Sequence, residues 1–176
     1  MKKILLGLVV AAILSVVFIS GCIQQPPINN TTCNITNPGI KTFKCIEGPV
    51  ETIDGKPIIR LLSTTWCPHC IWIKHTFDRV AKEYADAGKI VAYHWEMDTG
   101  DNTLTTEIET SVPDSEQAVF QKFNPNNTIP TFVFGGKYYR IGNGYEKDSA
   151  NGLQLEEQEF RAVIEELIKE AQRQSA

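Results

Sequence analysis

Residues 57–70 of this 176-residue chain read PIIRLLSTTWCPHC, and this stretch decides the fold. Its first half, up to Ser63, is nearly continuously apolar, which is typical of a strand buried on both faces in a parallel or mixed sheet. After Cys67, apolar residues recur every three or four positions, a period that predicts a helix ending near Gly88. Cys67 and Cys70 therefore lie where a buried strand gives way to a helix. The apolar positions of that predicted helix are Ile73, Phe77, Val80, Ala81 and Tyr84.

The Cys-x-x-Cys spacing at this junction predicts a reactive pair of thiols. Backbone N–H groups of a first helical turn point at the sulfur of Cys67, and the helix dipole favours its anion. Pro68 suits the turn because no N–H is needed there, and a protonated His69 adds positive charge. We therefore expect Cys67 to be the exposed nucleophile with a lowered pKa, and Cys70 to be the more buried resolving thiol. The pair is expected to form a disulfide that exchanges through a mixed disulfide on Cys67.

Half of a zinc site, or a plain structural disulfide, is the alternative interpretation of this pair. Zinc requires four ligands in closed geometry, and the remaining candidates, His75 and His94, provide no second ligand pair. We therefore predict no metal and no organic cofactor.

The segment Trp66-Cys67-Pro68-His69-Cys70, followed later by Ile129-Pro130-Thr131 ahead of a β-hairpin signal, resembles the thioredoxin fold family. The resemblance covers residues 50–171. It implies thiol–disulfide exchange and a cis Pro130 that faces the active-site disulfide. Ile129, Pro130 and Thr131, together with Trp66, would then bind an extended substrate segment. The alternative for Pro130 is an ordinary trans proline that opens an edge strand.

The sequence departs from that family at Leu61. Thioredoxins and many relatives have a buried acidic residue at this position, six residues before the first cysteine, as a proton acceptor for the second thiol. His94 or Glu96 on the neighbouring strand is a possible substitute, although a solvated or structural role is the preferred interpretation of each. Trp72 joins Trp66 as a candidate for an apolar rim, with core packing again preferred.

The direction of exchange is left open by two opposing resemblances. The Pro-His pair between the cysteines resembles the Dsb-type disulfide oxidases, whereas Ile129 before the proline resembles the reducing thioredoxins. Disulfide formation or isomerisation is the favoured reading, and a dedicated reductase that delivers electrons to a partner protein is the alternative.

The rest of the chain predicts an α/β fold with a mixed β-sheet flanked by helices. Gly135-Gly136 between two β-rich runs is a two-residue hairpin signal. An apolar stripe from Phe160 to Ala171 predicts a closing helix, and Trp95 is expected in the core. The predicted segments are strands at 57–63, 89–98, 131–134 and 137–141, a loop at 99–110, and a short helix from 113 to about 123.

Residues 1–21 have the pattern of a signal peptide or membrane anchor. Two lysines precede an apolar run from Ile4 to Ile19, which at about 16 residues is shorter than the roughly 20 that span a bilayer. The following Ser20-Gly21-Cys22 resembles the lipobox of bacterial-type lipoproteins, in which the cysteine becomes a lipid anchor. The alternative is an uncleaved signal anchor in which Cys22 is incidental. Both place the protein at the extracytoplasmic face of the cell membrane.

Residues 22–48 are rich in Asn, Thr, Gln and Pro, which predicts a polar tether ahead of a domain at 49–176. Cys33 and Cys45 are expected to form a disulfide, because disulfides persist outside the cytoplasm. That bridge would close a loop within the tether or attach the tether to the domain.

The expected function is therefore that of a membrane-tethered thiol–disulfide oxidoreductase. Its partners would be exported proteins with thiols or disulfides, together with a redox partner protein. A formal net charge of −4 does not support a nucleic-acid partner. From a different class of function, a redox-inactive binding or metal-carrying module stays open.

Overall fold

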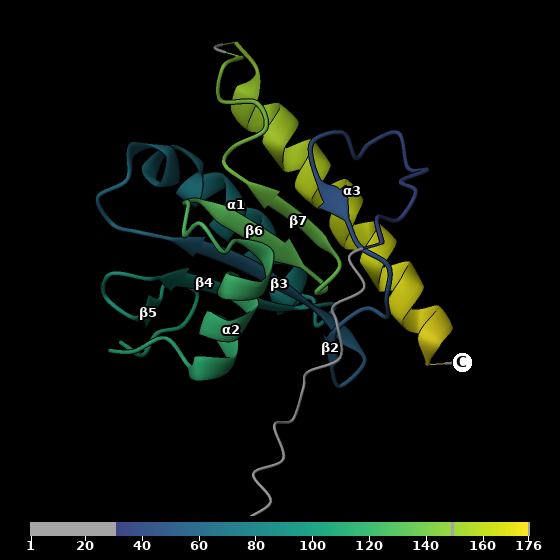
Figure 1. Ribbon diagram of the computed structural model, residues 1–176, viewed down its shortest axis with the longest axis horizontal. Helices are drawn as coiled ribbons and strands as arrows, with labels where there is room; N and C mark the ends of the chain where they lie inside the picture. The colour runs from purple at the N-terminus through teal and green to yellow at the C-terminus, as the bar shows by residue number, and fades with distance from the viewer. Residues whose placement is uncertain (1–30, 149, 176) are drawn as a thin grey trace, which may run out of the picture.

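The computed structural model describes residues 31–148 and 150–175, and its centre is strand β3 (Lys56–Ser63) (Figure 1). Strand β4 (Val91–Glu96) runs parallel to β3 on one side, and β6 (Thr131–Phe134) runs antiparallel to it on the other. The sheet order is β1-β7-β6-β3-β4-β5, and β2 pairs with β3 off this path. The outer strands are β1 (Lys44–Cys45), β2 (Thr52–Ile53), β5 (Asp101–Asn102) and β7 (Tyr138–Ile141). The result is a mixed open sheet.

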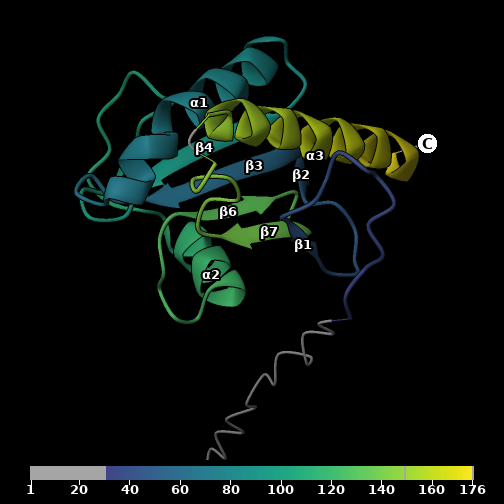
Figure 2. The same cartoon turned by 90° about the horizontal axis from the view of Figure 1, so that it is seen from above.

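Three helices cover the two faces of this sheet (Figure 2). Helices α1 (Pro68–Asp86) and α3 (Gly152–Gln174) lie on one face, and α2 (Asp114–Phe123) lies on the other. Because side chains alternate along a strand, Leu61 of β3 enters the core under α1 and α3, whereas Leu62 packs toward α2. Both faces of β3 are therefore buried, as the apolar run predicted.

Aromatic rings fill the larger core. Phe77 of α1, Phe132 of β6 and Phe160 of α3 meet with ring centroids 5.3–6.1 Å apart. Contacts at these distances add to the free energy of apolar burial. They hold both long helices, α1 and α3, against the same face of the sheet.

The main predicted elements are confirmed, with small shifts at their ends. The helix after Cys67 ends at Asp86, just before Gly88, whose φ is +69°. Gly135 and Gly136 have φ of 61° and 60° and join β6 to β7, as a two-residue hairpin turn with two positive φ values requires. The expected loop at 99–110 contains strand β5, which pairs with β4.

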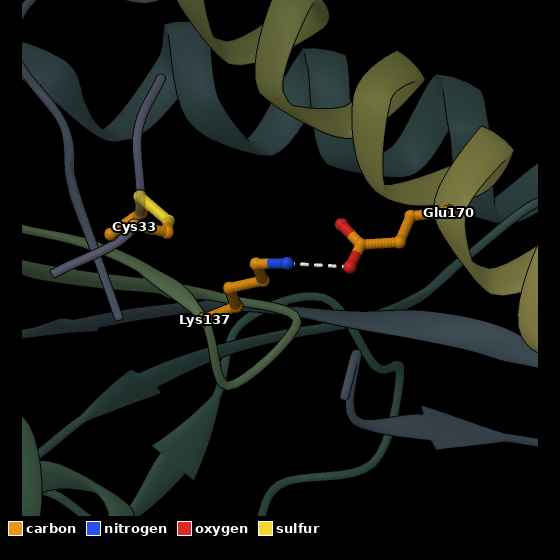
Figure 3. Close-up of a disulfide and its surroundings, with 4 residues drawn as sticks. Cys33, Lys137 and Glu170 are labelled. Carbon is orange, nitrogen blue, oxygen red and sulfur yellow. Dashed lines mark hydrogen bonds and ion pairs between the residues drawn. A yellow bond between two sulfur atoms is a disulfide. The ribbon is translucent and has the colours of Figure 1, made fainter. Parts of the chain in front are cut away.

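The segment expected to be a polar tether differs from that expectation over residues 31–48. Phe43 and Cys45 are buried in the core, and β1 adds to the sheet by pairing with β7. The segment has few apolar residues, so its average composition did not indicate that some of them are buried. The Cys33–Cys45 disulfide is present and lies beside the ion pair of Lys137 with Glu170 of α3, as Figure 3 shows. The bridge therefore closes a loop within this segment, and the pairing of β1 with β7 attaches the segment to the domain.

The predicted signal sequence and Cys22 fall within residues 1–30, which lie outside the described residues. Among the residues that the structure does describe, no helix combines the length and apolar character needed to cross a membrane.

Candidate active site

Cys67 caps the N-terminus of α1 directly after the end of β3. Its φ and ψ of −77° and 121° are extended, Pro68 occupies the first helical position, and the N–H of Ile71 donates to the carbonyl of Cys67 at 3.0 Å. No acidic residue occupies the first turn of the helix. The free N–H groups of this turn therefore favour an anion at the cap without a competing carboxylate.

Cys67 and Cys70 are both free thiols, so the structure has the reduced form of the pair. Cys70 is the more buried, with 2% of its surface exposed, but Cys67 is only 5% exposed. The expectation of an exposed Cys67 is therefore wrong for this form.

Burial raises the pKa of the Cys70 thiol to about 12, and a backbone hydrogen bond at Thr64 only partly opposes this. The hydrogen bond with Cys67 and the negative charge of Asp98 raise the pKa further. Cys70 is thus a protonated thiol at neutral pH. It must lose its proton before it can attack a disulfide.

His69 is held by the loop that follows β7, a contact that the sequence did not predict. Its Nδ1 lies 2.8 Å from the carboxylate of Glu146, and the side chain of Asn143 donates to the His69 carbonyl at 2.9 Å. Asn143 also donates to Glu146 at 2.9 Å. Partial burial opposes ionisation of Glu146, yet these hydrogen bonds from Asn143 and His69 lower its pKa.

A buried ion cluster anchors the same loop to α3. Arg140 of β7 forms ion pairs with Glu156 and Glu159, all three side chains being buried. Glu156 also accepts hydrogen bonds from the N–H groups of Gly144 at 2.7 Å and Tyr145 at 2.9 Å. The loop that contacts His69 is therefore held against α3 by charge-assisted hydrogen bonds to Glu156.

The Ile129–Pro130 peptide bond is cis, as the resemblance implied. Thr131 pairs with Leu62, so the start of β6 lies beside the end of β3, from which the chain enters the cysteine motif. The Thr131 side chain is fully buried and donates to the carbonyl of Thr128 at 2.7 Å. Its hydroxyl is therefore structural, and of the three predicted substrate-binding residues in this segment only Ile129 is partly exposed.

The tryptophans near the motif have different surroundings. Trp66 is 68% exposed directly before Cys67, whereas Trp72 is half-buried and packs against the core. Trp95 is buried, as predicted. Of the two tryptophans expected to form an apolar rim, Trp66 is therefore the one with a largely exposed side chain. The neighbouring Ile71 is also exposed.

His94 lies beside Leu61 in the parallel pairing of β3 and β4 and is fully buried. Its Nε2 lies 2.8 Å from the hydroxyl of Ser63, and its Nδ1 lies 2.5 Å from Asp78 and 2.9 Å from Thr103. With both ring nitrogens engaged, His94 has the structural role that the sequence favoured. His75 is exposed. Within residues 31–148 and 150–175, no group of three or more His, Cys, Asp or Glu side chains is placed to hold a metal.

The sequence matches no family model and no curated protein.

Proposed function

We propose that this protein is a thiol–disulfide oxidoreductase that acts through Cys67 and Cys70. The observation that carries the proposal is the asymmetry of the two thiols at one helix start. Cys67 caps α1, where the first N–H groups favour an anion, while burial keeps Cys70 protonated. A nucleophile and a protonated second thiol are the two components that dithiol–disulfide exchange requires.

In the reducing direction, the Cys67 thiolate attacks a substrate disulfide and forms a mixed disulfide, and one substrate thiolate leaves. Cys70 then loses its proton and attacks the sulfur of Cys67, which releases the second substrate thiolate and leaves a Cys67–Cys70 disulfide. In the oxidising direction, the same steps run backward from that disulfide. The leading version is disulfide formation or isomerisation, with dedicated reduction as the alternative.

The arrangement of elements supports a thioredoxin-like fold for this domain. A strand, the cysteine helix and a parallel strand are followed by a second helix, an antiparallel hairpin and a closing helix. The hairpin strand β6 lies next to β3 and is preceded by a cis proline. This order agrees with the resemblance carried by residues 66–70 and 129–131.

The substrates are exported proteins with thiols or disulfides, and electrons pass to or from a redox partner protein. This part of the proposal rests on the signal pattern of residues 1–21 and on Cys22 as a lipid anchor. The exposed Trp66 provides apolar surface beside the nucleophile for an unfolded or extended segment.

Two assays on the same protein test this function. Insulin reduction with an external thiol measures the reducing direction, and oxidation of a reduced test protein measures the oxidising one. We expect catalysis in at least one assay, and we expect Cys67→Ala to abolish it. A wild-type protein inactive in both assays, or a Cys67→Ala variant as active as wild type, would rule out the enzyme and leave a binding or metal-carrying module.

A further inference from the structure

Cys70 lies on a polar pocket of about 330 Å³ between the end of β3, helix α1 and the end of β4. Its lining side chains include Glu96 and Lys74. We propose that Glu96 is the general base that takes the proton of Cys70 when this thiol attacks the mixed disulfide on Cys67. This inference rests on the proposed function and assigns a residue to its second step.

The Glu96 carboxylate is oriented by a single hydrogen-bond partner. It is the last residue of β4 and is 8% exposed, and its Oε1 accepts a hydrogen bond from Lys74 at 2.7 Å. Among the residues that the structure describes, Oε2 accepts no hydrogen bond and so keeps its lone pairs free. A carboxylate held by an ammonium group and open on its other oxygen can accept a proton.

The pocket provides a route for this proton. Thr64 is one of its lining residues, and the hydroxyl oxygen of Thr64 is buried and has no hydrogen-bond partner within the described part of the chain. A polar space of this volume accommodates water, which bridges groups too far apart for a direct hydrogen bond. The proton therefore passes from Cys70 to Glu96 directly or through one water molecule.

Other groups near Cys70 are less suited to this role. Leu61 carries no proton acceptor, and both ring nitrogens of His94 are engaged. The carboxylate of Asp98 is bound by the N–H of Thr65 at 3.1 Å and by its hydroxyl. Asp101, which pairs with Glu96 across β4 and β5, accepts from the N–H of Glu109 at 3.0 Å.

The step balances without another reactant. The S–H bond of Cys70 breaks and its proton moves to Glu96, while the sulfur of Cys70 forms a bond to the sulfur of Cys67. The bond between Cys67 and the substrate sulfur breaks, and the substrate leaves as a thiolate. Glu96 then releases the proton to the pocket, and in the reverse direction it returns the proton to Cys70.

Stopped-flow reaction of the reduced full-length protein with an aromatic disulfide separates the two steps. Attack by Cys67 releases the first coloured thiolate, and attack by Cys70 releases the second. We expect Glu96→Gln to slow the second phase at least about tenfold at neutral pH, within the range of general-base effects, and to leave the first phase unchanged. Glu96→Asp should restore part of the rate. The matched control is Asp98→Asn, which removes a negative charge that raises the pKa of Cys70, so it should not slow the second phase.

The pH profile distinguishes a general base from a structural role. The wild-type second phase should level off with pH once the base is ionised, whereas in Glu96→Gln it should keep rising with pH. Lys74→Gln retains the Glu96 carboxylate but removes its cationic partner. It should therefore raise the pH of the bend, the pH at which the second-phase rate levels off. This variant also tests the inference if Glu96→Gln does not fold. An unchanged second phase in Glu96→Gln, an equal loss in Asp98→Asn, or an unmoved bend in Lys74→Gln would each overturn the inference. A wild-type protein without two phases would instead overturn the proposed function itself.

Discussion

The two thiols of the site differ in exposure by only a few per cent, but their surroundings separate their chemistry. Cys67 is the N-cap residue of α1, next to the free N–H groups of the first turn. Cys70 lies within that turn as a buried residue, and burial raises its pKa to about 12. Because a thiol reacts only as its thiolate, the fraction of reactive Cys70 keeps increasing as the pH approaches that value.

Alkylation of the reduced protein should therefore be strongly selective for Cys67. At mildly acidic pH we expect Cys67 to react first, and the rate at Cys70 should still be rising at the highest pH that the fold tolerates. Mass spectrometry after iodoacetamide treatment locates the label. A Cys70→Ala variant should trap client proteins as mixed disulfides, whereas traps formed only by Cys67→Ala would reverse the two roles.

The reduction potential of the Cys67–Cys70 couple tests the direction of exchange. From Leu61 in place of a buried acid, and from His69 beside the motif, we expect a potential above the thioredoxin value of about −270 mV. We expect His69→Gly to lower the potential by several tens of millivolts, measured by equilibrium with glutathione. A wild-type value at or below about −270 mV would favour the reductase instead.

At the scale of whole elements, the sequence predicted those that contain several turns or several apolar positions. Strand β3, helix α1 and the β6–β7 hairpin have such patterns, and the structure confirms them. The two-residue strands β1, β2 and β5 are too short to show a period. They exist because neighbouring strands offer free backbone groups.

The site shows the same division between local and distant signals. The cysteine motif is contiguous, so its helix start and its buried second thiol were predictable. The contacts of Glu146 with His69 and of Arg140 with Glu156 join residues far apart in the chain. No local pattern in the sequence marks Glu156 as the buried partner of a distant arginine.

Removal of the Arg140 charge should be costly. Arg140 faces two buried carboxylates, so Arg140→Met leaves both without a cation and should reduce the free energy of unfolding by about 3–5 kcal/mol. Urea denaturation measures the loss, which should shrink at mildly acidic pH, where protonation removes the uncompensated charge. Lys82→Met, which breaks an exposed pair with Asp86, is the control and should cost less than about 1 kcal/mol. Equal losses in the two variants would contradict this account.

The Cys33–Cys45 bridge should be structural and slow to exchange. It closes a loop with a sequence separation of 12, for which the chain-entropy model gives roughly 3 kcal/mol. We expect the double Cys33→Ala, Cys45→Ala variant to lose about that much stability in urea denaturation while retaining activity. Detection of a Cys33–Cys67 or Cys45–Cys67 cross-link during turnover would instead assign this pair to a redox relay.

For the molecule as a whole, the proposed membrane anchor can be tested at Cys22. The pattern before Cys22 predicts cleavage at this residue and its lipidation. Intact-mass measurement of protein extracted from membranes should find Cys22 as a lipid-modified first residue. A full-length N-terminus with an unmodified Cys22 would identify a signal anchor.

Strand β1 has a consequence for solubility. Without it, β7 would present an open row of backbone N–H and C=O groups, which is a template for aggregation. Under the proposed function, the protein would meet extended chains that could add to such an edge. The two residues of β1 pair with this edge of β7, and the disulfide from Cys45 to Cys33 holds them there. A reductant strong enough to open this bridge would therefore favour self-association of the protein, even while it keeps the catalytic thiols reduced.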